Sequence, residues 1–124
     1  MPILIDTHAL VWAVADSRRL SPAARARLTT PGERLCVSAV TAWEYTDLHR
    51  RGRLSRAGPF ETVVRLLRIE ILPLPADIWR VALSLPDIHG DPVDRMLVAH
   101  AITADLELMT ADGDMRKYPV KSIW

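Results

Sequence analysis

The sequence predicts an α/β sandwich in which helices pack around a mostly parallel β-sheet. Short apolar runs without polar alternation, such as Pro2-Ile3-Leu4-Ile5, are typical of strands buried on both faces of such a sheet. These runs alternate with segments that carry helix-start and helix-stop signals. The length of 124 residues is close to that of one average domain. We therefore expect residues 1–124 to form a single α/β domain.

In the N-terminal half, two strands and several helices are expected. Asp6 ends the first strand, and residues 8–15 are expected to form a short helix. Ser21-Pro22 predicts a helix start, because serine is a preferred N-cap and proline is favoured at the first helical position. This helix should stop before Pro31-Gly32. The remaining elements are expected as a strand at 34–38, a helix at 39–51 ending at Gly52, and a helix opened by Gly58-Pro59 and reaching residue 67.

The C-terminal half continues the alternation of strands and helices. Proline opens both predicted helices, because it is tolerated in the first turn, where its missing N–H is not needed. The expected elements are a strand at 69–74, a helix from Pro75 to residue 85, a loop at 86–90, a long helix from Asp91-Pro92 to residue 105, and strands at 108–110 and 120–123.

The composition excludes several classes of protein. With 49% hydrophobic and 25% charged residues, the chain lies within the globular range and outside the disordered one. Cys36 is the only cysteine, so an internal disulfide is impossible, and a buried thiol fits a reducing cytoplasm. The apolar N-terminal segment is interrupted by Asp6 and His8 and lacks a basic n-region, so secretion is not expected. No apolar run has the length of a membrane span, and we expect a soluble, cytoplasmic protein.

Basic residues are strongly biased toward arginine, with 14 Arg against Lys117 and Lys121. Arginine is suited to bidentate phosphate contact, although the base composition of a genome can produce the same bias. The densest basic segment, residues 49–56, is expected either to hold a polyanion or to complement a helix C-terminus. The four tryptophans are expected in the core or at interfaces rather than as base-stacking platforms: Trp12, Trp43, Trp79 and Trp124.

Four acids follow the predicted strands, where ligands bind in open α/β sheets. Asp6 follows the first strand, and Glu44 lies in the first turns of the helix after the second. Asp94 is in the first turn of the long helix, and Asp112 follows Leu108-Met109-Thr110. We therefore expect these carboxyl groups to meet at one edge of the sheet.

Each acid also has a purely structural interpretation. Asp6 could cap the helix that follows it. Thr41-x-x-Glu44 fits a capping box, and Asp91-Pro92-Val93-Asp94 fits an N-cap with a favourable first-turn acid. Asp112-Gly113 could be an ordinary tight turn.

Capping alone does not explain why four acids gather at one edge. Like charges within about 4–6 Å oppose one another's ionisation, so at least one carboxyl should have a raised pKa in the absence of a cation. A divalent cation removes this cost, and Mg²⁺ is commonly held by carboxylates and waters. No Cys/His cluster favouring zinc is apparent. The positive end of the helix at Pro92, together with Arg95, is expected to face the anionic oxygens of a substrate, with a simple surface position as the alternative for Arg95.

Several motifs, taken in order, resemble those of a known family. They are Ile3-Leu4-Ile5-Asp6-Thr7-His8, Ser38-Ala39-Val40-Thr41-Ala42-Trp43-Glu44, His89-Gly90-Asp91-Pro92-Val93-Asp94-Arg95, Leu97-Val98-Ala99-His100-Ala101 and Thr110-Ala111-Asp112. Together they resemble the PIN domain, specifically the VapC-type toxins of bacterial toxin–antitoxin pairs. Leu48, Val93 and His100 depart from the residues common in relatives, which carry lysine, phenylalanine and glutamine there.

The resemblance implies a Rossmann-like three-layer sandwich and endonucleolytic cleavage of RNA. It implies a homodimer and a cognate antitoxin that covers the active-site groove. It also implies a site for Mg²⁺ or Mn²⁺ formed by four acids: Asp6, Glu44, Asp94 and Asp112.

The mechanistic hypothesis is metal-assisted hydrolysis of an RNA phosphodiester. Asp6 and Asp94 are the first choices as direct ligands, Asp112 is next, and Glu44 is expected to act through water. Thr7 and Thr110, grouped with Arg95 as substrate-side residues, are expected to donate to these carboxylates or to satisfy local backbone. Whether one or two ions bind stays open. The alternatives are a Mg²⁺-dependent phosphohydrolase of small phosphate esters and a catalytically weak RNA- or partner-binding domain.

Overall fold

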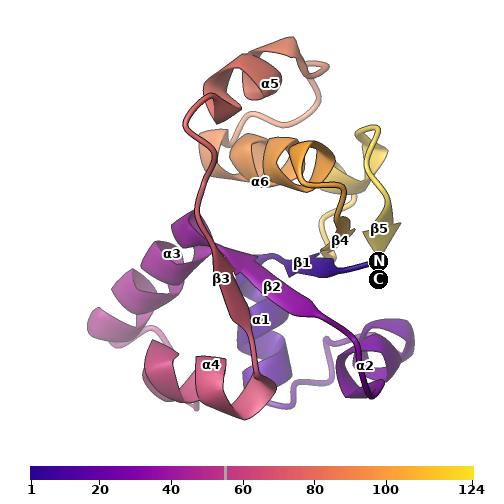
Figure 1. The fold of residues 1–124 in the computed structure, drawn as a ribbon. Helices are drawn as coiled ribbons and strands as arrows, with labels where there is room; N and C mark the ends of the chain where they lie inside the picture. Colours follow the sequence, from indigo (N-terminus) through magenta and orange to yellow (C-terminus); the bar gives the residue numbers. More distant parts are fainter. Residues whose placement is uncertain (55) are drawn as a thin grey trace.

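The computed structural model describes residues 1–54 and 56–124, and its centre is a single parallel β-sheet (Figure 1). Ser55, which belongs to the predicted basic segment 49–56, lies outside the described residues. The order of the strands is β3-β2-β1-β4-β5, and every neighbouring pair is parallel. All five predicted strands are confirmed, four with shorter bounds and β4 shifted by one residue toward the N-terminus: β1(Ile3–Ile5), β2(Leu35–Ser38), β3(Glu70–Leu72), β4(Glu107–Met109) and β5(Ser122–Ile123).

Helices cover both faces of the sheet, which gives three layers (Figure 1). One face carries α1(Thr7–Val14), α2(Pro22–Thr29), α3(Ala39–Arg50) and α4(Phe60–Leu67). The other carries α6(Pro92–Thr103) and the short 3₁₀ helix η1(Met115–Lys117), and α5(Ile78–Ser84) packs on the outer side of α6. The predicted α/β sandwich is therefore confirmed.

Two hydrophobic cores explain why the strands lack polar alternation. In β1, Ile3 and Ile5 enter the core beneath α1–α4, whereas Leu4 enters the core beneath α6. In β2, Val37 and Cys36 divide between the two cores in the same way. All five side chains are fully buried, and each large one contributes about 1.5–3 kcal/mol by leaving water. Burial on both faces fixes the sheet as the central layer.

Capping residues set where several helices begin. Ser21 caps α2 by accepting from the Ala24 N–H at 3.1 Å, as its Ser-Pro sequence predicts. The predicted helix start at Pro75 is wrong, because α5 begins only at Ile78. The Ile78 N–H donates to the Pro75 carbonyl at 3.1 Å, so the intervening residues form a turn instead of a first helical turn.

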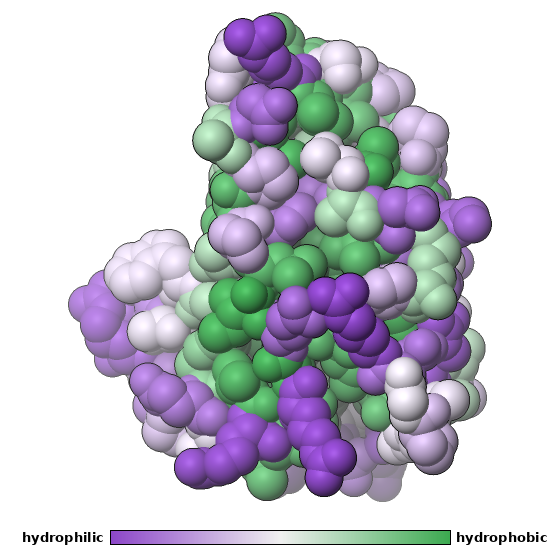
Figure 2. All heavy atoms as spheres, in the orientation of Figure 1, coloured by the Kyte–Doolittle hydropathy of each residue, from purple (hydrophilic) through white to green (hydrophobic). Residues whose placement is uncertain are grey.

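The exposed edge of the sheet at β3 carries an apolar surface. Hydrophobic side chains gather over β3 in Figure 2, and Ile71 of β3 and Leu66 of α4 are among the exposed large hydrophobic residues. An ion pair between Arg34 and Glu70, 2.7 Å apart, spans β2 and β3 at this edge. Charges of this kind oppose edge-to-edge pairing of sheets. No helix in the described parts of the chain is long and apolar enough to cross a bilayer.

Candidate active site

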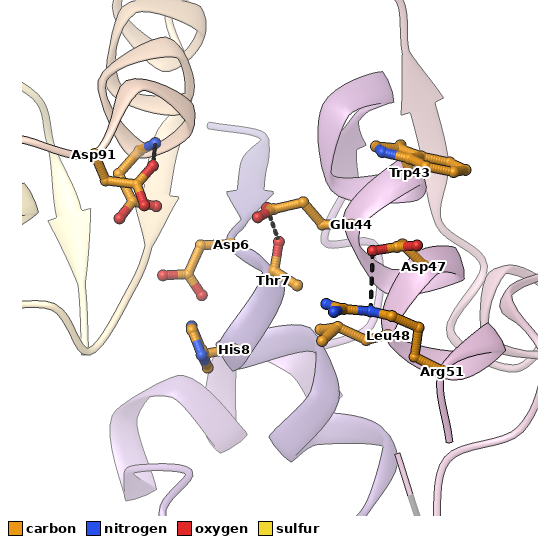
Figure 3. A pocket seen from close by; sticks show the side chains of 10 residues that line it. Asp6, Thr7, His8, Trp43, Glu44, Asp47, Leu48, Arg51 and Asp91 are labelled. Carbon is orange, nitrogen blue, oxygen red and sulfur yellow. Dashed lines mark hydrogen bonds and ion pairs between the residues drawn. The ribbon is translucent and has the colours of Figure 1, made fainter. Parts of the chain in front are cut away.

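An acidic groove lies beyond the carboxyl ends of β1, β2 and β4. It consists of two cavities that share three lining residues, Asp6, His8 and Asp94. The first cavity, the α3 arm, has a volume of about 260 Å³ and adds Thr7, Trp43, Glu44, Asp47, Leu48, Arg51 and Asp91 (Figure 3). The second, the Trp12 arm, has a volume of about 410 Å³ and adds Trp12, Arg19, Ala111, Asp112 and Met115. All four predicted acids therefore line one groove, as their positions after the strands lead one to expect.

Asp6 both caps a helix and lines both arms. Its Oδ1 accepts from the Ala9 N–H at 2.8 Å, so the structural interpretation as an N-cap is also true. The side chain is almost completely buried, and burial raises its pKa. Hydrogen bonding by Thr110 and Ala9 lowers the pKa, and the charge of Asp112 raises it further. The balance favours the protonated form more than in water.

Glu44 is positioned by a residue from another helix. The Thr7 hydroxyl of α1 donates to Glu44 Oε1 of α3 at 2.6 Å (Figure 3). The capping-box interpretation of Thr41 and Glu44 is wrong, because Ser38 caps α3 and accepts from the Val40 N–H at 3.3 Å. Thr41 therefore lies inside the helix. The contact of Thr7 with a carboxylate agrees with its expected hydrogen bond.

Asp94 has a strongly perturbed carboxyl group. Its pKa is raised to about 6, chiefly by burial and then by the charge of Asp91. Asp112 and Asp6 raise the pKa further, while His89 lowers it. The expectation of a raised pKa in this cluster is confirmed, although burial contributes more than repulsion. Asp91 itself caps α6 by accepting from the Val93 and Asp94 N–H groups at 2.8 and 3.2 Å.

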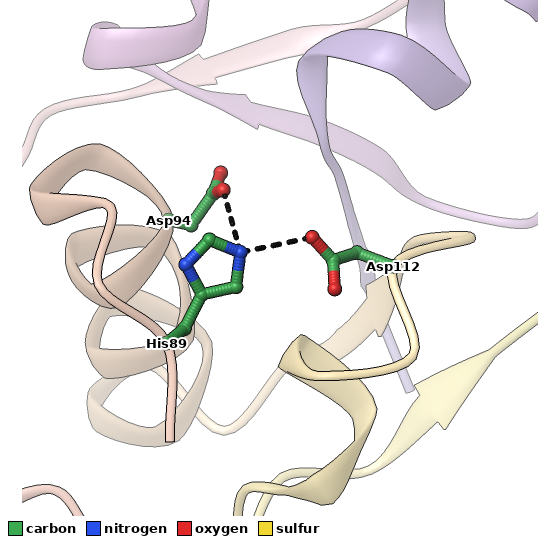
Figure 4. A group of neighbouring side chains, drawn as sticks. All are labelled: His89, Asp94 and Asp112. Carbon is green, nitrogen blue, oxygen red and sulfur yellow. Dashed lines mark hydrogen bonds and ion pairs between the residues drawn. The ribbon is translucent and has the colours of Figure 1, made fainter. Parts of the chain in front are cut away.

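His89, which the sequence motifs contain but do not mark as functional, bridges two of the acids. Its Nε2 lies 3.0 Å from Asp112 Oδ2 and 3.3 Å from Asp94 Oδ2 (Figure 4). Burial lowers the pKa of His89, but the bond to Asp112 and the nearby carboxylates outweigh it and raise the pKa overall. Ligand atoms of His89, Asp94 and Asp112 all lie within 4.8 Å of one another, so these residues could hold a metal ion.

Asp112 divides its two oxygens between backbone and groove. Oδ1 accepts from the N–H groups of Asp114 and Met115 at 2.8 and 3.3 Å, which closes the turn before η1. Burial raises the pKa of Asp112, but the bonds from His89 and these two N–H groups lower it more. The turn interpretation is therefore also true. Thr110 is fully buried and its hydroxyl accepts from the Asp112 N–H at 3.1 Å, so it supports the backbone of this turn.

Arg95 does not line the acidic groove, contrary to the expectation that it faces a substrate. Its guanidinium donates to the Ala82 and Pro86 carbonyls at 2.6 and 2.9 Å, and also reaches the Leu85 carbonyl. It also donates at 3.3 Å to the Tyr118 hydroxyl, which accepts from the His89 N–H at 2.7 Å. These bonds tie Arg95 to the end of α5 and to the loop that carries His89, and we therefore propose a structural role for it.

Arg95→Met is expected to lower the free energy of unfolding by about 1–3 kcal/mol, because methionine packs like the aliphatic stem but leaves carbonyl acceptors without a donor. Chemical denaturation of the metal-free protein measures this change. Arg80→Met, on the exposed face of α5, is the matched control and should stay within about 0.5 kcal/mol of the original protein. If the Arg95 variant kept its stability but bound RNA more weakly, the result would support the original prediction that Arg95 contacts the substrate.

Comparison with known proteins places this architecture in a family. Residues 3–121 match the PIN domain. The chain belongs to the PIN domain family. This PIN domain is 29% identical over 119 residues to Ribonuclease VapC22 of Mycobacterium tuberculosis (strain ATCC 25618 / H37Rv), with coverage of 94% of this chain and 91% of that protein.

Solved structures share the fold of this PIN domain. VapBC2 from Rickettsia felis, bound to a DNA fragment from its promoter, superposes with a TM-score of 0.74 at 14% identity, covering 99% of this chain and 98% of that one. VapC20 of Mycobacterium tuberculosis, a sarcin-ricin loop cleaving toxin, superposes with a TM-score of 0.66 at 20% identity, and the superposition covers 92% of each chain. At these identities the likeness concerns the fold.

Proposed function

We propose that this PIN domain is a metal-dependent endoribonuclease and the toxin of a toxin–antitoxin pair. The observation that carries the proposal is the meeting of four acids from distant parts of the sequence in one groove: Asp6, Glu44, Asp94 and Asp112. The similarity to a protein named Ribonuclease VapC22 supports RNA as the substrate. Acidic clusters of this kind bind the cations that assist phosphodiester hydrolysis.

The groove fits a divalent cation such as Mg²⁺, with Mn²⁺ as a substitute. Burial and mutual repulsion raise the pKa of Asp6 and Asp94, so ionising them without a cation is costly. A hard cation removes that cost, and carboxylate oxygens are its preferred ligands. The imidazole of His89 adds a nitrogen donor that suits Mn²⁺ as well. When bound, the cation would activate water and neutralise charge on the phosphate.

Each acid has a proposed task in this site. Asp6 and Asp94, which line both arms, would hold the cation, with Asp112 and His89 beside them. Glu44, held in place by Thr7, would orient a water molecule from the α3 arm. Hydrogen bonds from the backbone to Asp6 and Asp112 keep these carboxylates in a fixed orientation before substrate arrives. Preorganised charges of this kind lower barriers without reorganisation during the reaction.

The decisive experiment incubates the purified, antitoxin-free protein with total RNA, with Mg²⁺ or Mn²⁺ and with a chelator. Discrete RNA fragments that require the cation are expected. Intact RNA with retained RNA affinity would instead indicate a binding domain. Turnover limited to small phosphate esters would indicate a phosphohydrolase.

The proposed partner is an antitoxin whose segment covers the groove. This follows the toxin–antitoxin complexes among proteins of the same fold, such as VapBC2 and the complex from Klebsiella pneumoniae. Trp43 is 60% exposed at the rim of the α3 arm, where it offers an apolar contact (Figure 3). Its exposure excludes the core alternative for Trp43 and leaves the expected interface role, which stays a prediction. A homodimer is likewise proposed, and sedimentation of the free protein tests it.

A further inference from the structure

The acidic groove contains one arginine in each arm, and the two arms meet at the acids. Among the described lining residues, Arg51 is the arginine of the α3 arm and Arg19 that of the Trp12 arm. They come from different parts of the chain, since Arg51 is the C-cap of α3 and Arg19 lies in the loop between α1 and α2. The groove is thus negative where its arms meet and carries a positive side chain in each arm.

Arg51 is held in a position from which it can reach a ligand in the α3 arm. Its Nε lies 3.3 Å from Asp47 Oδ2, one helical turn earlier. Figure 3 shows the guanidinium turned back from the end of α3 toward Thr7, with Asp47 beside it. The ion pair engages Nε, and about half of the side chain is exposed. Because a guanidinium has five N–H donors in a planar fork, the terminal nitrogens remain suited to phosphate oxygens.

Arg19 is held by an aromatic surface instead of an acid. Its guanidinium carbon lies 5.8 Å from the centroid of the Trp12 ring, within range of a cation–π interaction. Trp12 in turn packs against Trp124, with ring centroids 5.6 Å apart, which fixes the platform. The exposed guanidinium therefore keeps its hydrogen-bond donors available to a ligand in the Trp12 arm.

The charge pattern selects for an extended polyanion. The acids repel any phosphate that is not paired with a cation, so a ligand needs attraction on both sides of them. A small phosphate ester bound at the acids occupies only the place where the arms meet. A nucleic-acid strand carries a phosphate at every nucleotide, and basic side chains that neutralise successive phosphates dominate such binding.

We infer that a single RNA strand lies through both arms, with Arg19 and Arg51 each holding a backbone phosphate on opposite sides of the bond to be cleaved. The inference rests on the proposed ribonuclease function and deepens it. It makes these two arginines substrate-positioning residues and Asp47 the residue that orients Arg51. The scissile phosphate lies over Asp6 and Asp94, which the two arms share.

The test measures binding of a fluorescent single-stranded RNA of about 12 nucleotides, a length within the usual range of single-strand sites. Binding is measured at several salt concentrations in an Asp94→Asn background, in which cleavage is expected to be too slow to disturb the measurement. Adding Arg19→Ala or Arg51→Ala should weaken binding about tenfold each. Each should also lower the slope of log affinity against log salt by about 0.7, the value for one phosphate contact on a single strand.

Matched controls separate this role from general charge and from folding. Arg50→Ala removes a neighbouring arginine that also pairs with Asp47 but does not line the groove. Arg80→Ala removes an arginine that packs on a tryptophan, Trp79, away from the groove. Both should keep the original affinity and slope. The conservative variants Arg19→Lys and Arg51→Lys should retain the slope, because they retain the charge.

The outcomes distinguish this inference from the proposed function. If both alanine variants bind the RNA as the background protein does, while the unmodified protein still cleaves RNA with Mg²⁺, the strand path is wrong and the ribonuclease function stands. If only one of them loses affinity, the strand uses one arm and the two-arm path is overturned. If the unmodified protein neither binds nor cleaves RNA, both proposals fail.

Discussion

Asp94→Asn is expected to reduce metal-dependent RNA cleavage by about a thousandfold, the effect of losing a principal electrostatic contact in a preorganised site. Asp94 lines both arms and lies 3.3 Å from His89 Nε2, so it is central to the proposed cation site. Asparagine keeps the shape of the side chain but lacks the charge that attracts the cation. The rate of fragment formation from RNA under single-turnover conditions measures the loss.

Asp114→Asn is the matched control for this experiment. Asp114 lies two residues from Asp112 but pairs with Lys117 at 3.0 Å and does not line either arm. The Asp114→Asn variant should cleave RNA at the rate of the original protein. Full activity in the Asp94 variant, or an equal loss in the Asp114 variant, would show that the proposed acids do not form the reaction centre.

The same Asp94 substitution should stabilise the metal-free protein at neutral pH. The folded protein raises the pKa of Asp94 from its ordinary value of 3.8 to about 6. Below both values the carboxyl is protonated in the folded and unfolded states, and it causes no difference. Between them only the folded state holds the proton, so stability falls as the pH rises from about 4 to about 6. Above pH 6 the loss is complete and amounts to at most about 3 kcal/mol.

Chemical denaturation between pH 4 and pH 8 in the presence of a chelator measures this effect. The difference in unfolding free energy between Asp94→Asn and the original protein should grow across the window and then remain constant. Added Mg²⁺ should then stabilise the original protein more than the variant, because binding to the folded state adds to its stability. Asp6→Asn should behave similarly, since asparagine can still cap α1. Variants clearly less stable without metal would mean that these acids are mainly structural.

The position of the acids could be predicted because it follows from the sheet. In a parallel sheet all carboxyl ends lie at one edge, so residues directly after buried apolar runs must come together there. Asp6 and Asp112 illustrate this, since each follows a strand and each lines the groove. Their structural interpretations were also true, because a carboxylate has two oxygens and can use one for the backbone.

Other features depend on tertiary contacts that the sequence does not display. His89 lies in a loop fixed by the Tyr118 hydroxyl, 29 residues away, so no local pattern marks it as a partner of the acids. Arg51 lines the groove from the end of α3, where it pairs with Asp47 one helical turn earlier. For Arg95, helical geometry did contain a signal. Successive helix residues point about 100° apart, so when Asp94 faces the groove its neighbour cannot.

The bonds that fix Asp6 and Asp112 also decide how many oxygens each can give to an ion. In both residues Oδ1 accepts from backbone N–H groups, which favours one orientation of the carboxylate and leaves Oδ2 as the oxygen without a backbone bond. Calcium often takes both oxygens of a carboxylate within a shell of six to eight, whereas magnesium accepts single oxygens in a strict octahedron completed by waters. If the groove holds a cation, we therefore expect the turn and the helix cap to favour magnesium over calcium.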